Sequence, residues 1–150
     1  FTDFNLVAKS DAKLMDMASS ALRNAYAPYS EFNVGSALLL DNEIIVTGNN
    51  QENSSFPCGI CAERVALFSA QSNYPKSVIK KIAITATSIN FELNEPAGPC
   101  GLCRQVLIEY EVKQASNIII LLFNSKKIIK IASAKDLLPL YFAEKKLKRN

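Results

Sequence analysis

Three stretches decide the fold of this chain: VIKKIAITAT (residues 78–87), GLCRQVLIEY (residues 101–110) and NIIILLF (residues 117–123). The first and the last are short runs of β-branched and apolar residues, which predict strands. The middle stretch places Val106, Leu107 and Tyr110 on one face, which predicts a helix. Strands in the parallel part of a sheet are buried on both sides, which explains the nearly continuous apolar run in the third stretch.

The elements before this unit are predicted from similar signals. Apolar residues recur at helical spacing after Ser10–Asp11, as far as Ala27–Pro28. Asp41–Asn42 is a turn signal between two runs that are rich in β-branched and apolar residues. We therefore expect a helix over residues 10–27, a hairpin of strands over residues 32–40 and 43–47, and a helix over residues 61–72.

After residue 123 the chain turns at Asn124–Ser125 into a further predicted strand, residues 127–131, and then a short helix, residues 134–138. A hairpin followed by strand–helix alternation predicts an α/β fold, a three-layer α/β/α arrangement with a five-stranded mixed sheet. With 150 residues and 49% hydrophobic composition, we expect one domain over residues 1–150.

The composition excludes several classes of function. The chain contains no histidine, which excludes Ser–His and Cys–His catalysis and His-ligated metal sites. No stretch is long and apolar enough to cross a bilayer, and no secretory signal is visible, so we expect a cytoplasmic protein. Much of the net charge of +3 comes from Lys145, Lys146, Lys148 and Arg149. We interpret these residues as a solvated terminus and expect no nucleic-acid or membrane partner.

Four cysteines form two C-x-x-C pairs, Cys58 with Cys61 and Cys100 with Cys103. Without a secretory signal, metal binding explains such pairs better than disulfides do. Cys61, Cys100 and Cys103 lie at the starts of two predicted helices, where the helix dipole favours a thiolate. These helix starts can meet at the strand ends, where the active sites of such sheets are usually found. The sequence therefore predicts a zinc site.

Two kinds of zinc site are compatible with this spacing. A closed site of four cysteines, as in a zinc ribbon, would make the chain a structural module. An open site of three thiolates leaves a position for water, and Glu63 can act beside it as general base and acid. Amphipathic helices after the cysteines and an ample core favour the open site. Cys58 is then spare, and we expect it to be a small buried residue.

Two arginines follow the predicted ligands. Three thiolates around Zn²⁺ leave one net negative charge, which would make a bound water harder to ionise. Arg64 follows Glu63, and Arg104 follows Cys103. We expect their guanidinium N–H groups to reach sulfur atoms and to offset this charge.

The residues around the cysteines resemble the two zinc signatures of the small homotetrameric cytidine deaminases. CAER (residues 61–64) resembles the first, and PCGLCRQ (residues 99–105) resembles the second. The broader zinc deaminase pattern also has a glutamate followed by P-C-x-x-C. Three further segments are similar to family segments: PYSEFNVG (residues 28–35), NQEN (residues 50–53) and LPLYF (residues 138–142).

This resemblance implies a cytidine deaminase-like fold with one Zn²⁺ per chain, held by Cys61, Cys100 and Cys103. Glu63 would move protons during hydrolytic deamination of free cytidine and 2′-deoxycytidine to uridine and 2′-deoxyuridine, with release of ammonia, in pyrimidine nucleoside salvage. The alternatives are a related nucleoside substrate, such as an aminoacyl-nucleoside antibiotic, a base within a polynucleotide, or the structural zinc module.

The resemblance also implies the substrate contacts. Asn50 and Glu52 would hydrogen-bond the ribose, mainly its 3′-hydroxyl, which a polynucleotide lacks in free form. Phe32 would contact the base, and the backbone N–H of Ala62 would face the base carbonyl oxygen. Phe142 would reach the site of a neighbouring subunit in a homotetramer.

Three positions depart from the family pattern. Asn49 stands where a cysteine is common, Phe56 stands where a tyrosine is common, and Cys58 replaces a residue without a thiol. The missing hydroxyl at Phe56 removes any ribose or inter-subunit hydrogen bond that a tyrosine would make there.

Overall fold

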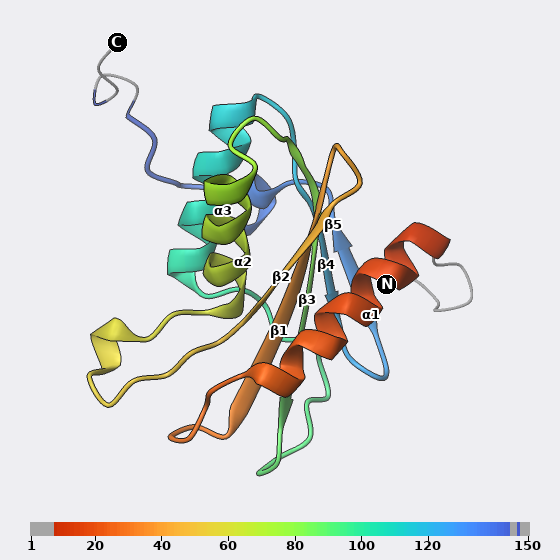
Figure 1. Cartoon of the computed structure of the whole chain (residues 1–150), viewed down its shortest axis with the longest axis vertical. Helices are drawn as coiled ribbons and strands as arrows, with labels where there is room; N and C mark the ends of the chain where they lie inside the picture. Colours follow the sequence, from red (N-terminus) through yellow and green to blue (C-terminus); the bar gives the residue numbers. More distant parts are fainter. Residues whose placement is uncertain (1–7, 145–146, 148–150) are drawn as a thin grey trace.

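The computed structural model describes residues 8–144 and 147 and shows a five-stranded sheet with helices on both faces (Figure 1). The strands lie in the order β2-β1-β3-β4-β5, and β3 and β4 are the parallel pair. The predicted α/β/α fold is therefore confirmed. The elements are α1 (Lys9–Ala21), η2 (Leu22–Asn24), β1 (Phe32–Leu40), β2 (Ile45–Asn49), η3 (Phe56–Cys58), α2 (Ala62–Asn73), β3 (Ile79–Ser88), α3 (Gly101–Gln114), β4 (Ile119–Phe123), β5 (Ile128–Ile131) and η4 (Ala134–Leu137).

The first helix differs most from its prediction. It begins one residue before Ser10 and passes into a short 3₁₀ turn after Ala21. Asp11 does not mark the helix start; its side chain is buried against the sheet, where it pairs with Lys81 at 2.5 Å and Lys130 at 3.8 Å. The last predicted helix is a 3₁₀ helix, and the basic residues after Glu144 lie outside the described part of the chain.

Each face of the sheet has its own apolar core. Along β1, Ala37 and Leu39 pack with α1, whereas Leu38 and Leu40 pack with α2 and α3. This alternation follows from the two-residue period of a strand. Figure 1 shows the resulting layers, with α1 on one side of the sheet and α2 and α3 on the other. Among the described residues, no helix is long and apolar enough to cross a membrane.

A close approach between β2 and α2 places the first turn of α2 on the sheet. A Cβ atom at Gly48 would lie 2.3 Å from the carbonyl oxygen of Ala62 and 2.6 Å from the backbone nitrogen of Ala66. Ser36 of β1 donates a hydrogen bond of 2.8 Å to the same Ala62 oxygen. Because both contacts involve backbone, they fix the position of the residue that follows, Glu63.

The substitution Gly48→Ala is expected to destabilise the protein by about 1–3 kcal/mol, because the backbone of α2 must move away from β2. Urea denaturation monitored by circular dichroism measures this change. Gly101→Ala is the matched control, since a Cβ atom there meets no atom within 4 Å. Equal midpoints for Gly48→Ala and the wild type would show that α2 is not held by this contact.

Candidate active site

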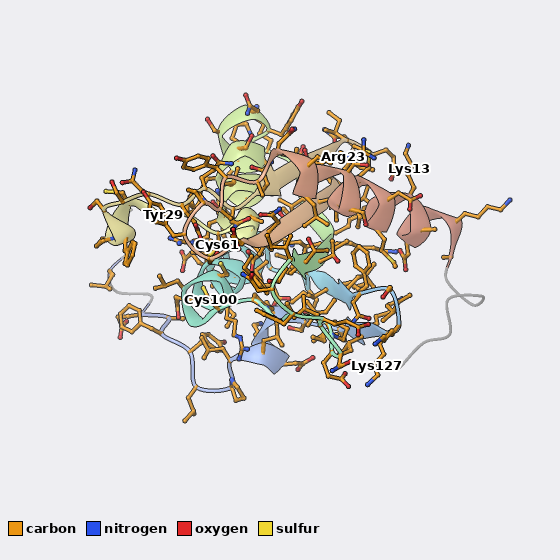
Figure 2. All side chains as sticks on the ribbon, turned by 90° about the horizontal axis from the view of Figure 1, so that it is seen from below. Lys13, Arg23, Tyr29, Cys61, Cys100 and Lys127 are labelled. Atoms are coloured by element: carbon orange, nitrogen blue, oxygen red, sulfur yellow. The ribbon has the colours of Figure 1, made fainter. Side chains whose placement is uncertain are left out.

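Three of the four cysteines come together where α2 and α3 begin. Cys61 precedes the first residue of α2, Cys100 precedes the first residue of α3, and Cys103 lies in the first turn of α3. The Sγ atoms of Cys61 and Cys100 are 3.7 Å apart, and those of Cys100 and Cys103 are 3.6 Å apart. Figure 2 labels Cys61 and Cys100 close together, where the two helices approach each other.

These distances fit a zinc ion. Tetrahedral coordination with Zn–S bonds of about 2.3 Å requires sulfur atoms about 3.8 Å apart. The three sulfur atoms lie within 4.8 Å of one another, and among the described residues no fourth His, Cys, Asp or Glu side chain joins this group. Thiolates are ligands that zinc prefers, so the residues present fit the metal that the sequence predicts.

Cys58 lies outside this group, and the expectation that it is buried is wrong. Its side chain is exposed at the end of η3, and its thiol faces the hydroxyl of Ser55 at 3.5 Å. The 3₁₀ turn after Ser55 turns the thiol toward solvent instead of the core. The grouping of three sulfur atoms favours the open site over the closed four-cysteine site.

The thiols of Cys61 and Cys103 shift each other's pKa in opposite directions. A hydrogen bond from Cys103, assisted by the Arg64 guanidinium, lowers the pKa of Cys61 to about 5. The same hydrogen bond, together with burial and the nearby charges of Glu63 and Cys61, raises the pKa of the Cys103 thiol well above its usual value. Cys61 and Cys103 can therefore ionise together only when a cation lies close to both sulfur atoms.

Glu63 stands beside the sulfur atoms in the first turn of α2, with only 4% of its surface exposed. Burial is the main cause that raises its pKa, and the negative charge of Cys61 acts in the same direction. A carboxyl group with a raised pKa holds a proton more readily than an ordinary glutamate, which suits a group that must take up a proton and later release it.

Glu63, Cys61 and Cys100 line a cavity of about 520 Å³. Phe32, Asn50 and Glu52, three of the predicted substrate residues, line the same cavity. The loop residues that complete the cavity were not predicted from the sequence, although Gly59 and Gly98 each stand two residues before a predicted ligand, Cys61 or Cys100. These additional lining residues include Ser30, Gly59, Ile60, Ala97 and Gly98.

The side chain of Asn50 holds the start of β1. Its Oδ1 accepts a hydrogen bond of 2.8 Å from the backbone nitrogen of Val34, and its Nδ2 donates one of 2.9 Å to the carbonyl oxygen of Phe32. The amide therefore positions the backbone of Phe32 at the edge of the cavity. A second donor hydrogen and a second acceptor lone pair of the amide remain for a ligand.

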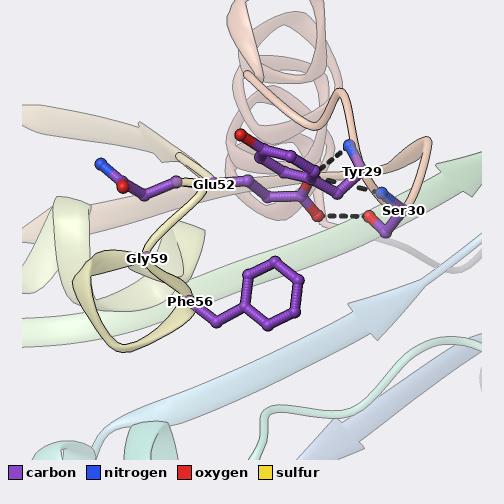
Figure 3. Close-up of a pocket in the computed structure, with 6 residues that line it drawn as sticks. Tyr29, Ser30, Glu52, Phe56 and Gly59 are labelled. Atoms are coloured by element: carbon purple, nitrogen blue, oxygen red, sulfur yellow. Dashed lines mark hydrogen bonds between the residues drawn. The ribbon is translucent and has the colours of Figure 1, made fainter.

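Glu52 lies at the junction with a second cavity of about 420 Å³ (Figure 3). Its carboxylate accepts hydrogen bonds from the hydroxyl of Ser30 and from the backbone nitrogens of Tyr29 and Ser30. The Ser30 hydroxyl and these two N–H groups hold its pKa below the usual value. Because a carboxylate has about four acceptor sites, one remains for a hydroxyl group.

The two arginines differ in their contacts. Arg64 follows Cys61 by three residues, so it lies on the same face of α2, and its Nη2 is 3.8 Å from the Cys61 sulfur. Arg104 was expected to reach sulfur as well, but its guanidinium instead donates to the carbonyl oxygens of Pro99, at 2.8 Å, and Leu137, at 3.1 Å. Adjacent helical residues point about 100° apart, which turns Arg104 away from the side of Cys103.

Ala62 and Phe142 do not line the cavity of their own chain in the described structure. Ala62 is fully buried as the first residue of α2, a position whose backbone N–H has no partner within the helix. Phe142 is 68% exposed, and its backbone exchanges two hydrogen bonds with the side chain of Gln105.

The comparisons with known proteins agree with this geometry. A family model of the cytidine and deoxycytidylate deaminase zinc-binding region matches residues 8–118. The cytidine deaminase of Halalkalibacterium halodurans is 43% identical over 96 residues, which are 64% of this chain and 68% of that protein. The cytidine deaminase of Sporosarcina psychrophila is 42% identical over 98 residues, 65% of this chain and 68% of that protein.

Solved structures show the same likeness. A cytidine deaminase from Burkholderia pseudomallei superposes with a TM-score of 0.76 at 36% identity, covering 87% of this chain and 98% of that one. A cytidine deaminase from Mycobacterium tuberculosis gives a TM-score of 0.68 at 30% identity, covering 96% and 100%. With a family match over most of its length, a shared fold and three sulfur atoms at zinc-binding distances, the chain belongs to the zinc-dependent cytidine deaminase family.

Proposed function

We propose that this chain hydrolyses free cytidine and 2′-deoxycytidine to uridine and 2′-deoxyuridine, with release of ammonia, as a single catalytic domain. One observation carries the proposal. A buried carboxyl group, Glu63, lines the same cavity as two metal-binding thiols and the residues Phe32, Asn50 and Glu52. The cavity thus combines a group that transfers protons with polar groups suited to a sugar.

Cys61, Cys100 and Cys103 would hold Zn²⁺, which when bound lowers the pKa of a water molecule and supplies a nucleophile at neutral pH. Glu63 takes one proton from the attacking water and delivers it to N3 of the pyrimidine while the oxygen adds to C4. It then transfers the second proton to the 4-amino group, whose bond to C4 breaks as ammonia leaves. Burial of Glu63 helps it to keep the proton between these two transfers.

The substrate contacts follow from the positions of the lining residues. Phe32 would contact the base, and the backbone N–H of Ala62 would donate to the base carbonyl oxygen, since it belongs to the first turn of a helix. The remaining acceptor site of Glu52 and the remaining amide sites of Asn50 suit the ribose 3′-hydroxyl, because a hydroxyl both donates and accepts.

The charges of the two cavities favour a nucleoside over a nucleotide. Among the described residues that line them, the acidic and basic side chains are Glu52 and Glu63, both carboxylates. Proteins bind phosphates with Arg, Lys or backbone N–H groups, so two carboxylates would repel a 5′-phosphate. In a polynucleotide the 3′-hydroxyl is also esterified, so it could not donate a hydrogen bond to Glu52.

A panel of five compounds tests this proposal: cytidine, 2′-deoxycytidine, 2′-deoxycytidine 5′-monophosphate, 3′-O-methylcytidine and a cytosine-containing aminoacyl-nucleoside. We expect turnover of cytidine and 2′-deoxycytidine, and losses in kcat/KM of roughly 10²-fold or more for 2′-deoxycytidine 5′-monophosphate and for 3′-O-methylcytidine. The loss of ultraviolet absorbance of the cytosine ring measures each rate. Equal rates for the 5′-monophosphate and the nucleoside would contradict the nucleoside assignment. Preferential turnover of a cytosine-containing aminoacyl-nucleoside would favour the related-substrate alternative.

The substitution Glu52→Gln is expected to raise the KM of cytidine by about 10- to 100-fold, because a hydrogen bond to a charged group is lost. Its effect on kcat should be smaller, since the proposed proton transfers are made by Glu63. Steady-state kinetics measures both constants. Glu43→Gln, which neutralises an exposed carboxylate in the β1–β2 turn, is the matched control. An equal KM for Glu52→Gln and Glu43→Gln would exclude Glu52 from ribose binding.

We further propose that the chain acts in pyrimidine nucleoside salvage in the cytoplasm as a homotetramer, in which Phe142 reaches the base in a neighbouring subunit. The exposure of Phe142 and the two hydrogen bonds that Gln105 makes with its backbone support this arrangement. Light scattering after gel filtration should give four times the chain mass of 16.5 kDa. A monomer that deaminates cytidine would contradict it.

A further inference from the structure

The loop that connects β3 to α3, residues 89–100, borders the cavity at two places. Ala97 and Gly98, near its end, line the cavity directly. Near its beginning, the loop leaves β3 beside Phe32, because Phe32 is the strand partner of Ser88. Figure 1 shows this loop at the same end of the sheet as the beginning of β1.

Two consecutive loop residues contact two consecutive residues at the start of β1. The ring of Phe91 stacks on the ring of Phe32 with 6.1 Å between centroids and 25° between planes. Asn90 donates a hydrogen bond of 3.0 Å to the carboxylate of Glu31. Glu31 has a φ of 52°, in the left-handed region that non-glycine residues seldom adopt. The loop therefore holds an unusual turn and the aromatic ring that follows it.

The orientation of the Phe32 ring depends on this contact. Asn50 fixes the backbone of Phe32, but it leaves the torsions of the side chain free. Phe32 is partly buried and lines the cavity. Phe91 contacts the ring of Phe32 from the loop. Phe91 itself is 55% exposed and does not line the cavity that holds Glu63.

The loop is attached firmly enough to support this role. The side chain of Asn124 donates a hydrogen bond of 2.9 Å to the carbonyl oxygen of Leu93. Lys126 forms an ion pair of 2.6 Å with Glu92, and Lys127 forms one with Glu95. These contacts join the loop to the turn between β4 and β5, on the side away from Phe32.

We propose that Phe91 is a positioning residue, which holds the ring of Phe32 in the orientation that receives the pyrimidine base. The proposal rests on the proposed function of the cavity. Because Phe91 does not line the cavity that holds Glu63, it acts on the binding of cytidine and leaves proton transfer unaffected. Its loss should therefore change KM and spare kcat.

Steady-state kinetics of four variants tests the proposal. Phe91→Ala should raise the KM of cytidine by about 3- to 10-fold, the range expected for the loss of one aromatic pair, with kcat within about two-fold of the wild type. Phe91→Leu, which keeps the apolar volume, should also raise KM, and Phe91→Tyr should restore it. Ile89→Ala is the matched control, because Ile89 is 80% exposed in the same loop.

The outcomes separate this inference from the proposed function. A wild-type protein that does not deaminate cytidine refutes the proposed function and this inference with it. Wild-type turnover with an unchanged KM in both Phe91→Ala and Phe91→Leu refutes the role of Phe91 alone. An equal increase in Ile89→Ala, or a failure of Phe91→Tyr to restore KM, shows a general effect of the loop and also overturns the proposal.

Discussion

The substitution Glu63→Gln is expected to lower the kcat for cytidine by about 10²–10⁴-fold, the usual contribution of a positioned general acid and base. The glutamine side chain has the same shape but cannot take up a proton from water or deliver one to N3. Because Glu63 is not one of the three residues that would hold the metal, the protein should still bind one zinc ion per chain. Ultraviolet assays and atomic absorption measure the two quantities on one preparation.

The decrease in kcat of Glu63→Gln should occur without a decrease in the stability of the protein. Glu63 is buried and its pKa is raised by burial, so a neutral amide of equal volume fits the same space. We therefore expect an unchanged thermal midpoint. A Glu63→Gln protein that keeps its zinc and its wild-type kcat would show that another group transfers the protons.

The second large effect concerns the metal ligands. Cys100→Ser is expected to weaken zinc binding by more than about 10²-fold and to abolish deamination, because one of three close sulfur atoms is lost. Cys58→Ser is the matched control, since the Cys58 thiol is exposed and lies outside the group of three. It should retain one zinc ion per chain and full activity.

Competition with a chromophoric zinc chelator measures both affinities. If Cys58→Ser also lost its zinc, the closed four-cysteine site would be correct and the water position would not exist. If Cys100→Ser kept wild-type affinity, the metal would be held by other residues. The comparison therefore separates a catalytic zinc site from a structural one by a measurement that does not depend on the substrate.

The fold could be predicted because its signals are local and repeated. β1 was predicted with its observed bounds, since its residues are mostly apolar and a turn signal follows. The parallel pair β3 and β4 followed from the helix between them and from the apolar run in β4. The meeting of Cys61 with Cys100 could be predicted in part, because α2 and α3 follow β2 and β3, which both run antiparallel to β1 and therefore end at the same edge of the sheet.

Other features depend on side-chain directions and on contacts distant in sequence. The sequence does not show that Arg104 turns toward Leu137, because η4 lies 33 residues away along the chain. The exposure of Cys58 depends on the 3₁₀ turn in which it lies. The stacking of Phe91 on Phe32 joins a strand to a loop without any periodic signal. Such contacts become visible only in three dimensions.

The most direct test of the proposed function is one reaction of zinc-loaded protein with cytidine, in which uridine and ammonia are both quantified. One uridine and one ammonia should form for each cytidine consumed. Removal of zinc should stop the reaction, and its return should restore it. A preparation with one zinc ion per chain that consumes neither cytidine nor 2′-deoxycytidine would contradict the proposed function.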